Sequence, residues 1–425
     1  MDMKRNLVSL IAALMACCLS LFAQSGPGYI SVTGKVIDAK TKFPVDYASV
    51  SLSGTGISNI TNSEGVFTLK IPSSGTSGKK ITVTHLGYAA LIIDVDELAS
   101  ASSSTPKKLE MIPVSLKIDA ALVKAMNARD LIDAAYSRVK YNYPQKKMGM
   151  TAFYRELIRK GNTRYLSLNE AIIDINKAPY RMNNADRAGI YKGRGSTNYN
   201  STDSLLVQYQ GGVISSLDID QVQNPFAGVY YSDIDKYYDF TMGESHIMDN
   251  KVFYVVNFNQ KDTQGEPLFR GSVFIDSETF AIGRVEMNMN VEGNPLATNI
   301  FVKKKPHKSK VEVTSAGYII NYKQLDDLWY YDYAMIDIRF TARGRFSLFK
   351  TNYSIVSEMA ITDRGDKEKD INSDNRMRFS DQLAKRVADF TDDNFWEDYN
   401  IIEPDQSVEV IIKKIVRQLK RRESN

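Results

Sequence analysis

Residues 34–52 read GKVIDAKTKFPVDYASVSL, and they are followed by GTGISNITNSEGVFTL at 54–69 and HLGY at 85–88. Short segments rich in Val, Ile and Thr are separated here by Pro, Gly, Asn and Ser. This alternation is typical of short antiparallel strands joined by tight turns. It predicts a small antiparallel β-sandwich of about seven strands over residues 29–113.

Several spaced motifs in this stretch resemble one domain family. GxVxD at 34–38, PxxxAxVxL at 44–52, NSEGxF at 62–67 and GY at 87–88 are similar to the carboxypeptidase regulatory-like domain. That family has a transthyretin-like sandwich and is found at the N-terminus of many exported Gram-negative envelope proteins. The resemblance implies an accessory or interaction domain rather than peptidase activity, because a fold carries function only through a site.

The first residues have the composition of a secretory signal peptide. Lys4 and Arg5 precede the apolar run 7–22, and small and polar residues follow it. We therefore expect a signal peptide over residues 1–23, with cleavage after Ala23.

An alternative export signal is the segment LMAC at 14–17, which resembles a bacterial lipoprotein box and would leave a lipidated Cys17. Under the first interpretation both cysteines, Cys17 and Cys18, lie inside the signal. The mature chain would then have no thiol for a disulfide, a nucleophile or a thiolate metal site. Both interpretations predict an exported protein in the periplasm or at the outer membrane of a Gram-negative bacterium.

The overall composition is that of an ordinary globular protein. The 425 residues are 43% hydrophobic and 24% charged, which predicts two or more domains with separate cores. The 54 basic and 50 acidic residues leave a net charge of +4. That charge is too small to indicate a nucleic-acid-binding surface.

Residues 114–148 are predicted to form a connector followed by an amphipathic helix. Apolar residues recur at helical spacing from Ala128 to Val139, Asn127 is a candidate N-cap, and Pro144 ends the element.

The hydrophobic pattern changes to alternation over residues 149–363. Predicted hairpins, such as 151–159 with 163–175, indicate one large, curved antiparallel sheet that is half-barrel-like. The predicted fold class is therefore mainly β, a transthyretin-like sandwich followed by this larger sheet with a few helices. GSVFID at 271–276 makes the region similar to the half-barrels of periplasmic lipoprotein carriers.

Two further motifs lie in this region. NYP at 142–144 followed by FYRE at 153–156, and DIDQVQNPF at 218–226, resemble the middle part of exported proteins of unknown function that begin with the same regulatory-like domain. Residues 178–204 are crowded with Asn, Arg, Gly and Ser, and they are predicted to form an exposed loop.

Residues 364–425 are expected to end in a basic amphipathic helix at 406–422. Its apolar stripe would dock on the sheet, while its basic face could contact an anionic membrane surface.

The sequence indicates no catalytic, cofactor or metal site. The histidines, His85, His246 and His307, lie in separate segments without an HxxE or HExxH motif, which argues against a zinc peptidase. GRGS at 193–196 lacks the frame of a nucleophile elbow or a phosphate loop and is predicted to be a flexible basic loop. The acidic pairs at 326–327 and 392–393 are predicted to lie in solvated turns.

Tyrosine is unusually frequent, with 24 in the chain. Aromatic rings with a polar tip can stack on sugars or line a lipid-binding cavity, but they also form cross-strand pairs on a half-exposed sheet. Cross-strand pairing is the favoured interpretation. The candidates for a ligand or partner surface are Tyr230, Tyr231, Tyr237, Tyr238, Trp329, Tyr330, Tyr331 and Tyr333.

These observations favour a non-catalytic, exported cell-envelope protein that acts in binding, scaffolding or assembly. Its partner would be an envelope protein, a lipid or a glycan. One alternative is a periplasmic lipid or lipoprotein carrier, which predicts an apolar cavity inside the curved sheet. A second alternative is a hydrolase acting on peptides or glycans, which predicts titratable groups that converge in a cleft.

Overall fold

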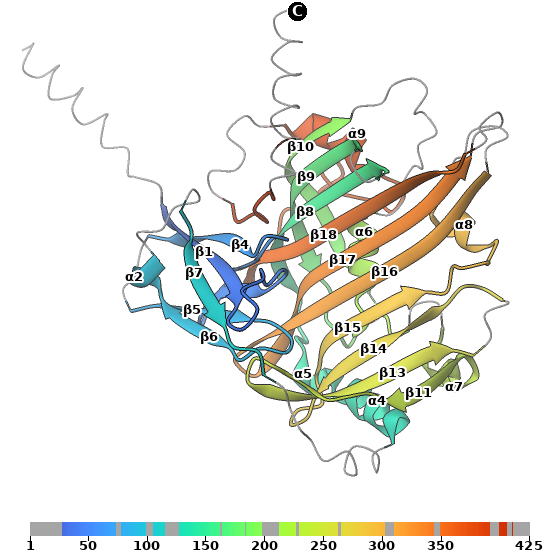
Figure 1. Cartoon of the computed structure of the whole chain (residues 1–425), viewed down its shortest axis with the longest axis horizontal. Coiled ribbons are helices and arrows are strands. Elements are labelled where there is room, and N and C mark those ends of the chain that lie inside the picture. Colours follow the sequence, from blue (N-terminus) through green and yellow to red (C-terminus); the bar gives the residue numbers. More distant parts are fainter. Residues whose placement is uncertain are drawn as a thin grey trace, which may run out of the picture.

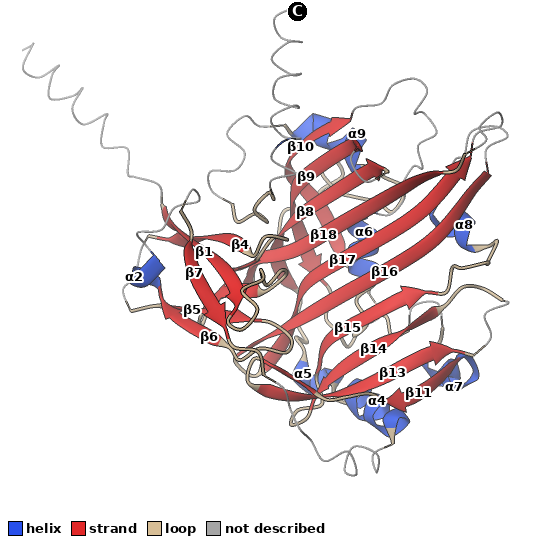
Figure 2. Ribbon diagram, in the orientation of Figure 1, coloured by secondary structure: helices blue, strands red, loops and turns tan. Residues whose placement is uncertain are grey.

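The computed structural model of the chain describes residues 28–73, 78–98, 105–114, 127–161, 164–182, 184–197, 212–226, 229–261, 265–301, 310–343, 349–391, 399–405 and 410. The predicted signal peptide, His307, the acidic pair at 392–393 and nearly all of the predicted C-terminal helix lie outside these residues. Strands dominate the described part of the chain (Figure 2). The predicted fold class, mainly β with a few helices, is confirmed.

The N-terminal part consists of two small sheets. The first has the strand order β4–β1–β7, with β1 at Tyr29–Asp38, β4 at Val66–Pro72 and β7 at Lys107–Met111. The second has the order β3–β2–β5–β6, with β2 at Ser49–Leu52, β3 at Ser58–Ile60, β5 at Lys80–Thr84 and β6 at Leu91–Asp94. Helix α2, at Val95–Leu98, follows β6.

The pairing of β1 with β7 is parallel, although the sequence pattern predicted antiparallel strands. A parallel pair needs a crossover connection, and the chain provides one by passing through the second sheet before it returns as β7. Alternate side chains of both sheets, including Val36, Leu69 and Ile81, are fully buried in a core of their own. Burial of each such side chain contributes about 1.5–3 kcal/mol.

The predicted amphipathic helix is present as α4, at Ala128–Ser137, followed by the short α5 at Val139–Asn142. Asn127 is the N-cap, as predicted, because its side chain accepts a hydrogen bond from the backbone N–H of Arg129. Leu131 and Ile132 are buried on the apolar face of α4.

Eleven strands of the described residues form one open antiparallel sheet, which we call the long sheet (Figure 1). Its order is β10–β9–β8–β18–β17–β16–β15–β14–β13–β11, and β12 pairs with β13. The strands are β8 Met148–Lys160, β9 Arg164–Lys177, β10 Arg187–Thr197, β11 Tyr238–Met242, β12 His246–Met248, β13 Lys251–Gln260, β14 Phe269–Asp276, β15 Ile282–Met289, β16 Lys310–Leu325, β17 Leu328–Arg343 and β18 Thr351–Gly365.

Most neighbours in the long sheet are also neighbours along the chain, so the predicted hairpins are confirmed. In the β8–β9 hairpin, for example, Phe153 lies opposite Ile172. The exceptions are β11, which pairs with β13, and β18, which returns to pair with β8 and places Ile355 opposite Ile158. The end of the sheet region therefore lies in the middle of the sheet.

The predicted exposed loop at 178–204 is wrong for residues 187–197, which form the edge strand β10. Ala188 and Ile190 are buried, and GRGS belongs to this strand rather than to a flexible loop. Residues 198–204 lie outside the described residues.

Gly193 gives the physical reason for this difference. A Cβ atom at Gly193 would lie 2.6 Å from Cγ1 of Val387, in the 3-10 helix η3 at Val387–Phe390. This helix follows α9, at Leu383–Arg386, and both pack on β10. A glycine in a strand often marks such a close approach of another element.

The two faces of the long sheet are covered differently. The sandwich lies against one face, while α4, α5 and α6, at Gly212–Asp218, lie on the other (Figure 1). On the helix-covered face, Val213 and Phe226 pack into the main hydrophobic core. The remaining short helices are η2 at Tyr231–Asp233, α7 at Ile234–Tyr237 and α8 at Ala297–Phe301.

Candidate functional site

The sandwich is joined to the long sheet where β3 meets β18. The Ser58 hydroxyl donates to the carbonyl of Ile361 at 2.7 Å, and the Arg364 guanidinium donates to the Ser58 hydroxyl at 2.9 Å. Ile60 shares a small buried cluster with Phe153 of the long sheet. Apolar contacts and hydrogen bonds therefore fix the sandwich at this joint.

A second contact involves the loop that follows β5. The backbone N–H of Gly87 donates to the carbonyl of Ile247 at 2.7 Å, and that of Ala90 donates to the side-chain oxygen of Asn250 at 3.0 Å. The sandwich therefore contacts the long sheet at two places. Between these two contacts an open space remains, with the sandwich on one side and the long sheet on the other.

The open space between these walls is a cleft with a volume of about 410 Å³. This volume lies within the range of about 300–1,000 Å³ that is usual for small-molecule sites. The sandwich wall carries the hydroxyls of Ser51, Ser53, Thr55 and Thr82. The wall from the long sheet carries Met148, Lys323, Gln324, Leu325, Asp326, Tyr330, Arg364 and Asp366.

A smaller cavity of about 30 Å³ adjoins the cleft, which is enough space for water. Lys323 and Gln324 line both spaces, so they separate the cleft from the interior of the joint. The other polar residues around the small cavity include His85, Arg284 and Asp332.

Lys323 is the most unusual group in the cleft. No described residue forms a hydrogen bond or an ion pair with its amine, and the side chain is half-buried. Burial lowers the pKa of Lys323 to about 8, although the charges of Asp332 and Asp249 act in the opposite direction. Partial desolvation of an ammonium without a direct partner is costly unless a bound anion or water compensates it.

Three charged groups act on Lys323, namely Asp332, Arg364 and Asp249, and the first two are paired with each other. Arg364 forms an ion pair with Asp332, and both side chains are almost completely buried. The guanidinium of Arg364 also donates to the carbonyl of Gly56 at 3.2 Å. Asp332 additionally accepts a hydrogen bond from the Ser49 hydroxyl at 3.2 Å.

His85 and His246, the two histidines in the described residues, do not form a metal site with their surroundings. Nδ1 of His85 lies 2.8 Å from the carbonyl oxygen of Leu86, and burial lowers the pKa of His85, with Arg284 contributing in the same direction. His246 begins β12 and packs on Phe274. Within the described part of the chain, no group of three or more His, Cys, Asp or Glu residues could hold a metal ion.

The predicted aromatic residues do not form one surface. Tyr230 and Tyr237 are exposed, Tyr231 and Tyr330 are partly buried, and Tyr238, Trp329, Tyr331 and Tyr333 are buried. Of these residues, Tyr330 lines the cleft and Trp329 lines the adjoining cavity. A role of the eight residues in ligand binding stays a prediction.

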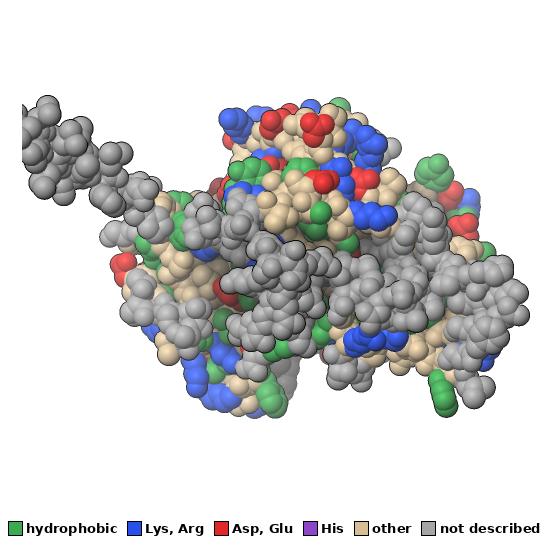
Figure 3. All heavy atoms as spheres, turned by 90° about the horizontal axis from the view of Figure 1, so that it is seen from above, with side chains coloured by type: hydrophobic (Ala, Val, Ile, Leu, Met, Phe, Trp, Pro, Cys, Tyr) green, Lys and Arg blue, Asp and Glu red, His purple; other side chains and the backbone are tan. Residues whose placement is uncertain are grey.

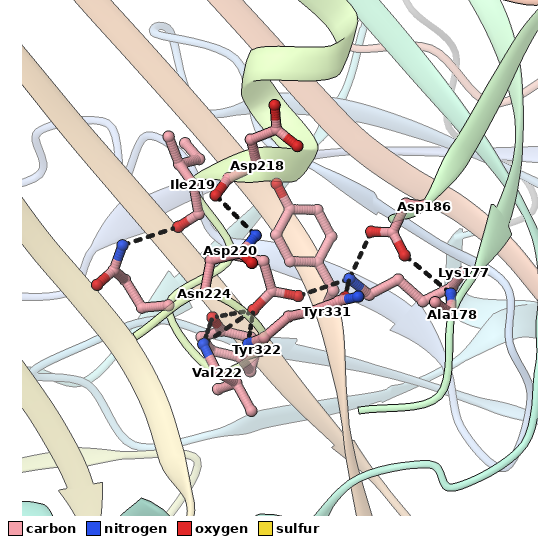
Figure 4. Close-up of polar contacts among 12 residues, drawn as sticks. Lys177, Ala178, Asp186, Asp218, Ile219, Asp220, Val222, Asn224, Tyr322 and Tyr331 are labelled. Atoms are coloured by element: carbon pink, nitrogen blue, oxygen red, sulfur yellow. Dashed lines mark hydrogen bonds and ion pairs between the residues drawn. The ribbon is translucent and has the colours of Figure 1, made fainter. Parts of the chain in front are cut away.

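On the opposite face of the long sheet lies a buried ionic cluster (Figure 4). The Lys177 amine is 2.6 Å from a carboxylate oxygen of Asp186 and 2.7 Å from one of Asp220. The Tyr322 hydroxyl donates to the other oxygen of Asp220 at 2.7 Å. Burial alone would lower the pKa of Lys177, but the two carboxylates raise it above its usual value.

This cluster attaches the DIDQVQNPF segment to the long sheet. The carboxylate of Asp220 accepts a hydrogen bond from the backbone N–H of Val222 at 3.0 Å, and the carboxylate of Asp186 accepts one from the backbone N–H of Ala178 at 2.8 Å (Figure 4). The charged groups are thus used to hold two connecting segments in place. The sequence marked Asp220 only as part of a motif and gave no indication of Lys177.

A second buried cluster lies on the sandwich side. Arg155 donates to Glu170 at 2.7 Å, and Glu170 also accepts from Arg194 at 2.7 Å. Arg155 further donates to the carbonyl of Ile402 at 2.8 Å. This arginine of the FYRE motif therefore connects the long sheet to the C-terminal segment.

The family comparison concerns the N-terminal part. The model of the CarboxypepD_reg-like domain matches residues 32–115. These residues form a CarboxypepD_reg-like domain. The resemblance inferred from the sequence motifs is thereby confirmed, and no curated protein matches the whole sequence.

Solved structures show distant similarity. A LolA superfamily protein from Nitrosomonas europaea has 10% identity and a TM-score of 0.25, over 58% of this chain and 96% of that one. A chain of the MucA–MucB complex of Pseudomonas aeruginosa has 9% identity and a TM-score of 0.19, over 55% of this chain and 93% of that one. A protein of unknown function from Bacteroides fragilis has 11% identity and a TM-score of 0.15, over 79% of this chain and 98% of that one. At such identities, similarity concerns the fold alone.

Proposed function

We propose that this protein is a non-catalytic binding protein of the cell envelope, and that it holds a small polar ligand in the cleft between the sandwich and the long sheet. The observation that carries this proposal is the half-buried Lys323, which lines the cleft and whose amine has no hydrogen-bond or ion-pair partner among the described residues. A ligand with an acceptor group would compensate the desolvation of this amine.

The cleft is suited to binding because both of its walls are fixed. Hydrogen bonds from Ser58 to Ile361 and from Arg364 to Ser58 hold the sandwich at β18, and the loop after β5 holds it near β12. Preorganised walls reduce the entropy lost when a ligand binds. The CarboxypepD_reg-like domain would then act as one half of a binding site and not as a regulator of a peptidase.

The groups in the cleft support a non-catalytic role. Arg364 and Asp332 are committed to each other, and the ring of His85 lies against the Leu86 carbonyl. The other carboxylates around the two spaces are Asp326 and Asp366, which are exposed at the rim of the cleft, and Asp249, which is half-buried at the adjoining cavity. Among the described residues, Asp332 and His85 are thus already engaged with neighbouring groups, which disfavours either of them as a general base.

The carrier alternative would require an apolar cavity on the helix-covered face of the long sheet. In the described residues, Leu131 of α4, Val213 of α6 and Phe226 pack into a core on that face. Filling by these side chains disfavours a lipid-sized cavity there, and the cleft on the opposite face is the better candidate site.

The proposed location is the periplasm or the outer membrane, because residues 1–23 have the composition of an export signal. No helix in the described residues is long and apolar enough to cross a membrane. Basic and acidic side chains are intermixed over the upper part of the described surface in Figure 3.

Ligand retention tests the proposed function. Ser53 is exposed at the cleft wall, so a Ser53→Trp side chain would occupy the cleft without replacing a core residue. Ser73→Trp, at an exposed position outside the cleft, is the matched control. The proteins are purified from the native envelope and analysed by native mass spectrometry.

We expect wild-type protein and Ser73→Trp to carry a small polar molecule that Ser53→Trp has lost. A molecule that all three proteins retain would bind elsewhere and would contradict the proposal. A wild-type protein that carries nothing after incubation with envelope extract would contradict it as well.

A further inference from the structure

We propose that the ligand of the cleft is an acidic saccharide, with its carboxylate on the amine of Lys323 and its ring against Tyr330. This inference rests on the proposed function and specifies the ligand class. It depends on three features of the cleft, which are the hydroxyl-rich wall, the single free cation and the half-exposed aromatic ring.

The sandwich wall is suited to sugar hydroxyls. The Thr55 hydroxyl donates to the carbonyl of Leu52 at 2.8 Å, and the Ser51 hydroxyl donates to that of Thr82 at 3.3 Å. Their oxygens keep lone pairs that can accept further hydrogen bonds. A ligand with several hydroxyl donors would satisfy this wall.

The same wall disfavours an acidic peptide. Strand β2 lies between β3 and β5, so its backbone donors and acceptors are used inside the sheet. An extended peptide is usually bound through a free sheet edge, and this wall has none. Recognition at β2 must therefore come from side chains.

The charges favour a carboxylate over a phosphate group. Lys323 is the one cation of the cleft lining that has no partner among the described residues, because Arg364 is occupied by Asp332 and Gly56. A single ammonium matches the one negative charge of a carboxylate better than the two of a phosphate monoester. The exposed carboxylates of Asp326 and Asp366 would further repel a dianion.

Tyr330 completes the site from the strand that follows the β16–β17 turn. Its side chain is partly buried and lines the cleft beside Gln324. An aromatic ring presents an apolar face and a polar edge, which matches the two kinds of surface on a sugar ring. The structure thus assigns a role to one of the aromatic residues that stood out in the sequence.

Binding of the acid group should depend on pH. The groups that act on Lys323 are Asp332 on β17, Arg364 on β18 and Asp249 in the turn before β13. Burial lowers the pKa of Lys323 to about 8, so the amine is charged below that pH and mostly neutral above it. Affinity for a carboxylate should therefore fall as the pH rises through about 8.

Calorimetric titration of the full mature protein tests this inference. The probes are digalacturonic acid, the neutral disaccharide cellobiose, galactose 1-phosphate and a triglutamate peptide. We expect Lys323→Met to weaken digalacturonate binding at least about tenfold, because a charge-assisted hydrogen bond is lost. Lys108→Met, an exposed lysine on the far strand β7, should leave binding unchanged.

A second variant separates the acid group from the ring. Tyr330→Ala should weaken digalacturonate and cellobiose to a similar extent, whereas Lys323→Met should affect only the acidic disaccharide. Because Tyr330 is only partly buried, this variant tests the ring contact even if the lysine variant changes the fold. Wild-type binding of digalacturonate should also be weaker at pH 9.5 than at pH 7.

Several outcomes would overturn the inference while leaving the proposed function intact. These are tighter binding of the phosphate or the peptide than of digalacturonate, and digalacturonate binding that is indifferent to Lys323→Met. If none of the four probes binds but Ser53→Trp still loses the native ligand, the acidic saccharide is rejected as the ligand while the cleft remains the binding site. Retention of the native ligand by Ser53→Trp would instead reject the cleft itself.

Discussion

Two lysines of the long sheet have opposite electrostatic environments. Lys177 is surrounded by Asp186, Asp220 and Gln223, and its pKa is raised because the carboxylates outweigh burial. Lys323 has no such partners among the described residues, and burial lowers its pKa. A buried charge that the protein itself satisfies belongs to the scaffold, whereas one left unsatisfied in a cleft indicates a site for a ligand.

Replacement of Lys177 tests the scaffold role. Lys177→Met would leave Asp186 and Asp220 buried without a cation, so we expect a loss of about 3–5 kcal/mol in the free energy of unfolding. The measurement is urea-induced unfolding at pH 7. Lys236→Met removes an exposed pair with Asp233 and is the control, for which we expect no measurable loss. Equal effects of the two variants would contradict a special role of the cluster.

The sequence could predict few of these individual residues. Lys323 lies in YIINYKQL at 318–325, where a lysine among apolar and polar residues looks like an ordinary outward-facing strand position. It lines a cleft together with Ser51 and Thr82, which are more than two hundred residues earlier in the chain. Tyr330 was identified from aromatic clustering, but that clustering did not separate it from the buried Trp329, Tyr331 and Tyr333.

At the scale of elements, alternation predicted the strands of the sandwich and several hairpins of the long sheet. It did not predict β10 at Arg187–Thr197, because Gly and Arg interrupt the apolar pattern of that strand. The strand forms because β9 offers an edge for pairing and because η3 covers it on one face. Tertiary contacts of this kind override local propensity.

Gly193 allows this arrangement to be tested. In Gly193→Ala, the new Cβ would lie 2.6 Å from Val387 Cγ1, so η3 must move away from the strand. We expect a loss of about 1–3 kcal/mol in the free energy of unfolding, measured by thermal and urea unfolding.

Gly265→Ala is the matched control for this prediction, because nothing lies within 4 Å of the position of its Cβ. It should have the stability of the wild-type protein. Unchanged stability of Gly193→Ala would show that η3 does not pack closely on β10.

At the scale of the molecule, the C-terminal segment 399–405 connects the two β-rich parts. Asn400 exchanges hydrogen bonds with the backbone of Lys70 on β4, at 2.7 and 3.2 Å. The carbonyl of Ile401 accepts from Asn59 of the sandwich at 2.7 Å, and that of Ile402 accepts from Arg155 of the long sheet at 2.8 Å. No local sequence pattern could predict these contacts, because the residues that form them lie hundreds of positions apart in the chain.

A joint built in this way should make the sandwich and the long sheet unfold together. Arg364→Met would leave Asp332 buried without its partner at the β3–β18 joint, and it would remove the hydrogen bonds to Gly56 and Ser58. We expect calorimetry of the wild-type protein to show one transition, because the two parts share a buried cluster. In Arg364→Met, the sandwich should unfold at a lower temperature than the long sheet, giving two transitions.

The control for the joint is Arg339→Met, which removes an exposed pair with Asp337 on the same sheet. It should keep the single transition at the wild-type temperature, since exposed pairs contribute little. Two transitions in the wild-type protein would mean that the parts are independent, and the cleft would then have one movable wall. One unchanged transition in Arg364→Met would mean that apolar contacts such as Ile60 with Phe153 hold the joint without the ion pair.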